Sequence, residues 1–195
     1  HCARSLSMNL KTLRLLPLAA FVVSLSAMAS EDNAALIKQG VYVARAADCG
    51  ACHRTVEQGG ALFSGGYAID SPMGRIISSN ITPSKTHGIG DYTEQQLADA
   101  LRKGVNAKGQ HLYPAMPYTA YQGMSDADIH ALYVYLQQGV KPVDKAVPAT
   151  ELAFPFNVRA LMFGWNLLFL DASSATWPAD ADEPLKRGQY LVDTL

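Results

Sequence analysis

The residues of this chain best suited to chemistry are Cys49, Cys52 and His53, spaced as Cys-x-x-Cys-His. Two thiols on one helical turn can each bond a vinyl group of the same porphyrin, and the adjacent imidazole can then bind the iron. The pair could instead be half of a structural zinc site, a redox dithiol or a disulfide. Zinc needs two further ligands at similar spacing, and the remaining cysteine, Cys2, is far upstream. A redox dithiol follows a strand, whereas residues 41–48 have a helical pattern, so the spacing favours covalent haem c.

The second axial position of such an iron decides its chemistry. An open position binds oxygen or peroxide, whereas a methionine closes it, raises the reduction potential and leaves electron transfer. Met116 lies between Pro114 and Pro117, which stiffen its loop; Met73 is the main competitor. We therefore predict His53 and Met116 as iron ligands, and a monohaem protein with an open distal site (a haem enzyme or gas sensor) as the alternative. Three further histidines lie in polar surroundings typical of solvated side chains: His87, His111 and His130.

Helical patterns flank the motif. Residues 34–47 have apolar side chains at helical spacing, and Gly40 among them indicates close approach of another helix. A capping box at residues 93–96 begins a second helix, which Gly104 ends, and residues 125–139 form a third. The pattern predicts an all-α domain wrapped around a ligand.

The segments between these helices are predicted to be loops. Residues 59–75 are rich in glycine, with room for a brief hairpin, and residues 106–123 contain the prolines beside Met116. Arg75 could neutralise a haem propionate through paired hydrogen bonds, or could be an ordinary surface arginine.

The amino terminus has the pattern of a secretory signal peptide. From Met8 onward, the basic residues Lys11 and Arg14 precede an apolar run at residues 15–25 and a small-residue cleavage pattern ending at Ala29. The run is shorter than the ~20 residues that a membrane span requires. Because covalent haem attachment uses thiols presented outside the cytoplasm, the signal and the haem motif support each other. We expect a periplasmic protein.

Composition limits the functional classes. The chain has 195 residues, of which 49% are hydrophobic and 17% charged, with a formal net charge of −1. These values are typical of a globular protein. The chain has no basic run, so nucleic-acid binding is not expected.

We expect four regions along the chain. Residues 1–29 are the signal peptide and upstream residues, residues 34–140 the haem c domain, and residues 141–183 a linker. The last residues, 184–195, would begin a second, truncated domain, because Leu-Lys-Arg-Gly-Gln-Tyr-Leu there parallels Ile-Lys-Gln-Gly-Val-Tyr-Val in the first helix. Short similarities can also arise by chance.

Several segments together carry a family resemblance. Besides the haem motif they are Ser-Asn-Ile-Thr-Pro at 79–83, Gly-Ile-Gly-Asp-Tyr at 88–92, Ala-Leu-Arg-Lys-Gly-Val at 100–105, His-Leu-Tyr-Pro-Ala-Met-Pro-Tyr at 111–118, Phe-Asn at 156–157 and Gly-Trp-Asn at 164–166. In this combination the chain resembles the cytochrome c subunits of membrane-bound periplasmic alcohol, aldose and gluconate dehydrogenases.

The resemblance implies class I cytochrome c domains, three in a full-length member, each with its own haem c, and often a carboxy-terminal anchor in the inner membrane. It also implies a partner dehydrogenase subunit, which holds pyrroloquinoline quinone or flavin and oxidises the sugar or alcohol, and ubiquinone as electron acceptor. Cys49, Cys52, His53 and Met116 match the family's haem-binding positions in the first domain. No substrate chemistry is expected in this chain itself.

One apolar segment remains, at residues 158–170. It is too short to span a membrane and contains Arg159 and Asn166. We expect an apolar part of the linker packed against the haem domain. The alternative is a docking surface for the dehydrogenase or the membrane interface, with Trp165 at its boundary.

Overall fold

The computed structural model describes residues 16–55, 60–170 and 184–195. The chain divides into two compact units, His1–Ala35 and Leu36–Leu195. Most of the signal-peptide prediction lies outside the described residues. Of residues 1–29 only the backbone from Leu16 onward is described, as the start of helix α1 (Leu16–Ala46). Within the described residues, no helix combines the length and apolar character needed to cross a membrane.

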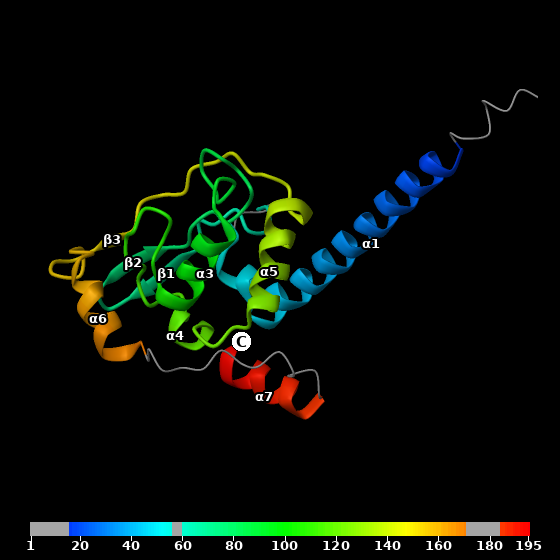
Figure 1. Ribbon diagram of the computed structural model, residues 1–195. Coiled ribbons are helices and arrows are strands. Elements are labelled where there is room, and N and C mark those ends of the chain that lie inside the picture. The colour runs from blue at the N-terminus through cyan, green and yellow to red at the C-terminus, as the bar shows by residue number, and fades with distance from the viewer. Residues whose placement is uncertain (1–15, 56–59, 171–183) are drawn as a thin grey trace, which may run out of the picture. The chain divides into compact units, whose positions relative to one another are not determined.

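The second unit consists mainly of helices joined by long loops (Figure 1). After the last turns of α1 come α2 (Cys49–Cys52), α3 (Glu94–Lys103), α4 (Tyr118–Tyr121), α5 (Asp126–Val134), a π-helical continuation η1 (Tyr135–Gly139), α6 (Leu161–Phe169) and α7 (Pro184–Thr194).

The core of this unit forms where α1 crosses α5. Gly40 makes the crossing possible, because a Cβ there would lie within 3.0 Å of the Ala131 carbonyl and of the Tyr135 side chain. Beyond the crossing, Val43 and Ala44 are buried in the core. The close approach predicted from this glycine is confirmed.

The ends of α3 and α5 follow their capping residues. The Thr93 hydroxyl accepts a hydrogen bond from the Gln96 backbone, and the Gln96 side-chain oxygen accepts one from the Thr93 backbone, which completes the predicted capping box. Gly104 ends α3 in the left-handed conformation at φ 61°. Ser125 caps α5 by accepting from the Asp128 backbone. Apolar faces of the two helices enter the core through Leu97, Leu101, Ile129, Leu132 and Leu136.

The structure also contains a small antiparallel sheet, so the all-α prediction was incomplete. Strand β1 (Ala68–Ser71) pairs with β2 (Gly74–Ile77), and β2 pairs with β3 (Glu151–Leu152). The β1–β2 hairpin lies in the predicted glycine-rich loop. Its third strand comes from about 75 residues further along the chain, a distance at which local sequence patterns carry no pairing information.

The described part of the predicted linker packs against the domain that precedes it. The Asn80 amide donates to the Val143 carbonyl at 2.8 Å, and the Val143 backbone donates to the Thr82 hydroxyl at 3.1 Å. The Ile77 backbone donates to the Thr150 hydroxyl at 3.0 Å. Residues 141–170 therefore lie along the domain that precedes them.

Helix α7 contacts the start of α5. Arg187 pairs with the buried Asp128 at 2.7 Å, and the buried Tyr190 hydroxyl accepts from the Ser125 backbone at 3.1 Å. A Cβ at Gly188, the counterpart of Gly40 in the sequence repeat, would meet nothing within 4 Å. That α7 begins a second haem domain stays a prediction.

Candidate haem site

A cavity of about 310 Å³ lies inside the helical unit, within the usual range of about 300–1,000 Å³ for cofactor pockets. Its walls are mostly apolar and come from α3, α5, η1 and the small sheet. The aliphatic side chains that line it are Ile69, Ile76, Ile77, Ile81, Ile89, Leu97, Leu101, Leu112, Leu132 and Leu136. Such a cavity suits a largely apolar group.

The two cysteines line this cavity from α2. Asp48 precedes the helix in the left-handed conformation at φ 50°, which turns the chain sharply after α1. Cys49 and Cys52 then follow on one helical turn, and neither forms a disulfide. Burial raises the pKa of the Cys49 thiol to about 11, so this thiol is protonated at neutral pH. Two free thiols at the wall fit thioether attachment of a porphyrin.

His53 is held in one orientation by a hydrogen bond to the backbone. Its Nδ1 lies 2.7 Å from the Ser79 carbonyl. Because a carbonyl only accepts hydrogen bonds, Nδ1 must carry the ring proton, which leaves Nε2 with a free lone pair. Burial lowers the pKa of His53, more than the Ser79 hydrogen bond raises it, and this favours the neutral, metal-binding imidazole.

Met116 reaches the same cavity on a loop anchored at both ends. At the entrance, Leu112 donates from its backbone to the Gly104 carbonyl at 2.7 Å. At the exit, the ring of Tyr118 packs under Gly104, so closely that a Cβ there would lie 2.8 Å from it. The Tyr118 hydroxyl donates to Asn166 at 2.8 Å. These anchors bring Met116 to the cavity that Cys49, Cys52 and His53 line.

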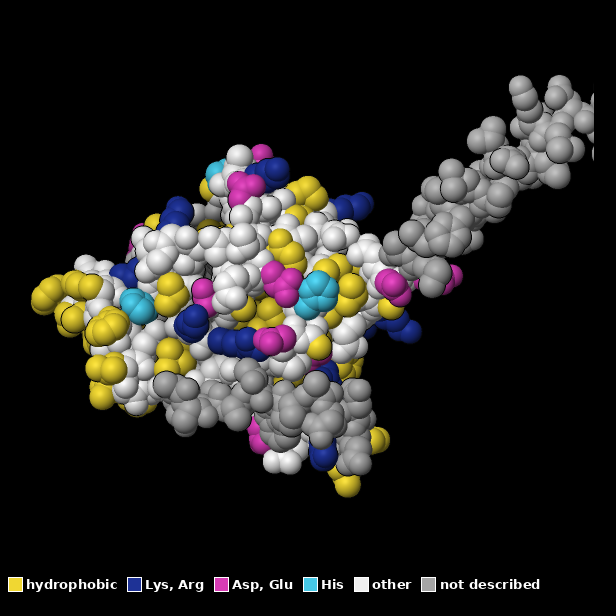
Figure 2. Space-filling model, in the orientation of Figure 1, with side chains coloured by type: hydrophobic (Ala, Val, Ile, Leu, Met, Phe, Trp, Pro, Cys, Tyr) yellow, Lys and Arg dark blue, Asp and Glu magenta, His cyan; other side chains and the backbone are white. Residues whose placement is uncertain are grey.

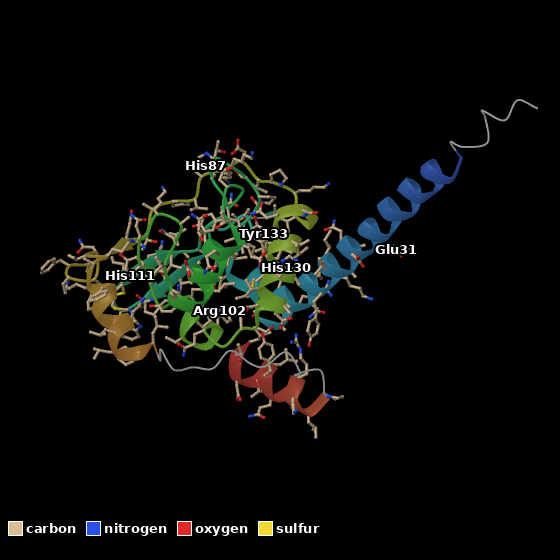
Figure 3. The ribbon with its side chains drawn as sticks, in the orientation of Figure 1. Glu31, His87, Arg102, His111, His130 and Tyr133 are labelled. Atoms are coloured by element: carbon tan, nitrogen blue, oxygen red, sulfur yellow. The ribbon has the colours of Figure 1, made fainter. Side chains whose placement is uncertain are left out.

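The competing ligands lie elsewhere. Met73 is in the turn between β1 and β2 and does not line the cavity, and among the described residues Met116 is the only methionine that does. His87, His111 and His130 also lie outside it, well apart from one another (Figure 3). Arg75, considered above as a propionate partner, pairs with Asp70 at 2.8 Å on the surface instead.

The cavity includes residues that sequence reasoning missed. The Tyr121 hydroxyl donates to the Ala47 carbonyl at 2.7 Å and so ties α4 to the end of α1, beside the haem motif. Thr150 and Arg159 line the cavity from the predicted linker. Ser79 also lines the cavity and belongs to one of the family segments, but that segment did not reveal its hydrogen bond to His53.

The donor set fits haem c better than zinc. The part of the chain that the structure describes contains no group of three or more His, Cys, Asp or Glu side chains that could hold a metal ion. Two thiols, an imidazole with one free nitrogen and a thioether around an apolar cavity are instead the protein groups that hold haem c.

Helix α6 buries a polar side chain and exposes most of its apolar ones. Its buried residue is Asn166, which donates to the Lys103 carbonyl at 3.0 Å and contacts His111 Nδ1 at 3.1 Å. The expected inward packing of the apolar residues was therefore wrong, because the inward face is used for these hydrogen bonds. Yellow atoms gather over α6 at the left of Figure 2. The exposed apolar side chains of the helix are Leu161, Phe163, Trp165, Leu167, Leu168 and Phe169.

Known proteins support this interpretation. The chain is 49% identical over 160 residues to the fructose dehydrogenase cytochrome subunit of Gluconobacter japonicus, across 82% of this chain and 33% of that protein. It is 44% identical to the gluconate 2-dehydrogenase cytochrome c subunit of Pantoea cypripedii, across 89% of this chain and 39% of that protein. It is 41% identical to the cytochrome c subunit of an alcohol dehydrogenase (quinone) from Gluconobacter oxydans (strain 621H), across 86% and 35% respectively.

The chain thus spans 33–39% of the length of these relatives. The family model described as Cytochrome c matches residues 37–139, which include both cysteines, His53 and Met116. The matched segment contains the haem motif, the oriented imidazole and most of the residues that line the apolar cavity, and the chain belongs to the cytochrome c family.

Proposed function

We propose that this chain carries the first haem domain, of class I type, of a dehydrogenase cytochrome c subunit and transfers single electrons. One observation carries the proposal: the anchored Met116 loop reaches the cavity where His53 presents a free Nε2. The His53 imidazole and the Met116 thioether would be the two protein ligands of the haem iron, and an iron held by both would have no free position for a substrate and would serve electron transfer.

The side chains divide the work. Haem c supplies a one-electron couple when bound. Cys49 and Cys52 tether it, and Ser79 holds the His53 ring in one tautomer and orientation. The apolar walls exclude water, which favours the less charged, reduced form, and a thioether ligand raises the potential further. On this proposal the domain only carries electrons, and the oxidation of a substrate takes place on a partner subunit.

The partner is proposed from the relatives, which are named as cytochrome subunits of fructose, gluconate and alcohol dehydrogenases. On this proposal a separate subunit with pyrroloquinoline quinone or flavin oxidises a sugar or alcohol, and this domain passes its electrons, one at a time, towards ubiquinone. Further haem domains in the full-length protein would continue the path. The exposed apolar face of α6 suits contact with another protein surface.

The proposed location is the periplasm, at the inner membrane. Two features support it: the signal-peptide pattern that ends at Ala29, and a pair of cysteines whose thiols must stay reduced until haem is attached outside the cytoplasm. Fusing residues 1–35 to a reporter that is active only after export tests this, and a reporter that stays in the cytoplasm would contradict it.

The ligand assignment is tested by visible spectroscopy of the matured holoprotein. We expect a low-spin spectrum with the methionine–iron charge-transfer band at its red edge, and no carbon monoxide binding by the reduced protein. Met116→Ala should abolish the band and open the iron to carbon monoxide. Met73→Ala is the matched control and should leave both properties unchanged. Carbon monoxide binding by the unaltered protein would favour the open-site alternative, and loss of the band in Met73→Ala would identify the competing ligand.

A further inference from the structure

Arg159 is the only lysine or arginine among the described residues that line the haem cavity. It lies beyond residues 37–139, the segment that the cytochrome c family model matches. The cavity is also lined by an acidic side chain, Asp48. The cavity therefore offers one permanent cation, and that cation comes from outside the family domain.

The guanidinium of Arg159 is fixed in place. Its Nη1 donates to the His111 carbonyl at 2.9 Å, and its Cζ lies 4.5 Å from the centroid of the Tyr113 ring. Both contacts are on the loop that carries Met116. One more contact orders the neighbourhood, because Asn166 on α6 binds the Lys103 carbonyl and His111. Little side-chain entropy is left to lose when a ligand binds this cation.

Among the described residues, the remaining N–H donors of Arg159 have no negatively charged partner. A guanidinium has five N–H groups in a planar fork, and among the described residues it has one hydrogen-bond acceptor, the His111 carbonyl. Haem c carries two propionate carboxylates, and carboxylates are the groups that the fork binds in bidentate fashion. Arg75, the other arginine considered for this role, is exposed and occupied by Asp70.

We propose that Arg159 binds a propionate of the haem and raises its reduction potential. The inference deepens the proposed function and rests on it, because it assigns the linker segment a part in setting the electron-transfer potential. The sign follows from electrostatics. The iron centre is more positive when oxidised, so a nearby cation destabilises the oxidised form relative to the reduced form. Removing that cation must therefore favour oxidation and lower the potential.

The test is redox titration of the matured holoprotein, followed in the visible spectrum. Arg159→Gln removes the charge and keeps most of the side-chain volume, whereas Arg159→Lys keeps the charge without the fork. Arg75→Gln is the matched control, because it removes one positive charge from a solvent-screened surface site. At a fixed applied potential we expect the ratio of reduced to oxidised protein to fall by roughly tenfold in Arg159→Gln, equivalent to 59 mV for a one-electron couple. Arg159→Lys should lie close to wild type, and Arg75→Gln should equal it.

Several outcomes would overturn the inference. An unchanged potential in Arg159→Gln, or an equal fall in Arg75→Gln, would show that Arg159 has no specific effect on the haem. Loss of the methionine–iron band in both Arg159 variants would show that the residue only holds the Met116 loop through His111 and Tyr113. If Arg159→Gln fails to mature, Arg159→Met also removes the charge and keeps most of the side-chain volume, and an unchanged potential in that variant would equally overturn the inference. A chain that incorporates no haem at all would instead refute the proposed function.

Discussion

Replacing Gly40 with alanine tests the helix crossing on which the haem domain depends. The added Cβ would lie within 3.0 Å of the Ala131 carbonyl and of the Tyr135 side chain, closer than Cβ contacts in real structures. Because one of the two obstacles is backbone, α1 and α5 must move apart. Because a backbone carbonyl cannot rotate aside, the overpacking cost lies in the upper part of its usual range, about 2–3 kcal/mol, and the better helix propensity of alanine returns about 1 kcal/mol. We expect a net loss of about 1–2 kcal/mol in the free energy of unfolding.

Gly188 provides the matched control. It also lies within a helix, α7, and corresponds to Gly40 in the sequence repeat, but its Cβ would meet nothing within 4 Å. Gly188→Ala should be neutral or stabilise the protein by up to about 1 kcal/mol.

The assay is thermal unfolding of the holoprotein, followed by far-ultraviolet circular dichroism and by Soret absorbance. In a domain of this size the midpoint moves by roughly 5 °C for each kcal/mol, so Gly40→Ala should unfold about 5–10 °C below wild type. Equal midpoints for Gly40→Ala and wild type would refute the crossing geometry. A fall in Gly188→Ala as large as that in Gly40→Ala would show that the effect comes from the substitution itself and not from the contact.

Two further predictions concern stability. Asn80 is 3% exposed and donates to the Val143 carbonyl at 2.8 Å. Asn80→Ala should lower the free energy of unfolding in urea by about 1–3 kcal/mol, because buried groups lose their hydrogen-bond partner. Asn157→Ala, at an exposed position, is the control and should cost little; equal urea midpoints for the two variants would contradict the role of this contact. The Lys103 hydrogen bond lowers the pKa of Asp99, so its contribution is present above the unfolded pKa of about 3.9 and is lost as pH falls through the lower folded value. Asp99→Asn should therefore lower the free energy of unfolding by roughly 0.3 kcal/mol at neutral pH and leave it unchanged at strongly acidic pH. A loss of stability that persists in acid would show that the ion pair is not its source.

Local sequence was sufficient for the haem motif and for three of the helices, namely the end of α1, α3 and α5. The Cys-x-x-Cys-His spacing, the capping box at Thr93 and the helix end at Gly104 each depend on residues within one or two turns of the chain. Such interactions form between near neighbours, so the residue types alone predict them. Gly40 belongs to the same class, since a glycine inside a helix indicates close contact even when the partner is unknown.

Only the tertiary structure decided which distant residues share the cavity. The Ser79 carbonyl lies 26 residues from His53, and β3 lies about 75 residues from β2. Met116 lines the cavity and Met73 does not, although both have a neighbouring proline. The apolar segment of α6 gave no sign that its polar Asn166 would be the buried residue. These choices depend on the packing of segments that are far apart in the chain, and the periodicity of a single segment contains no information about the segment that it will meet.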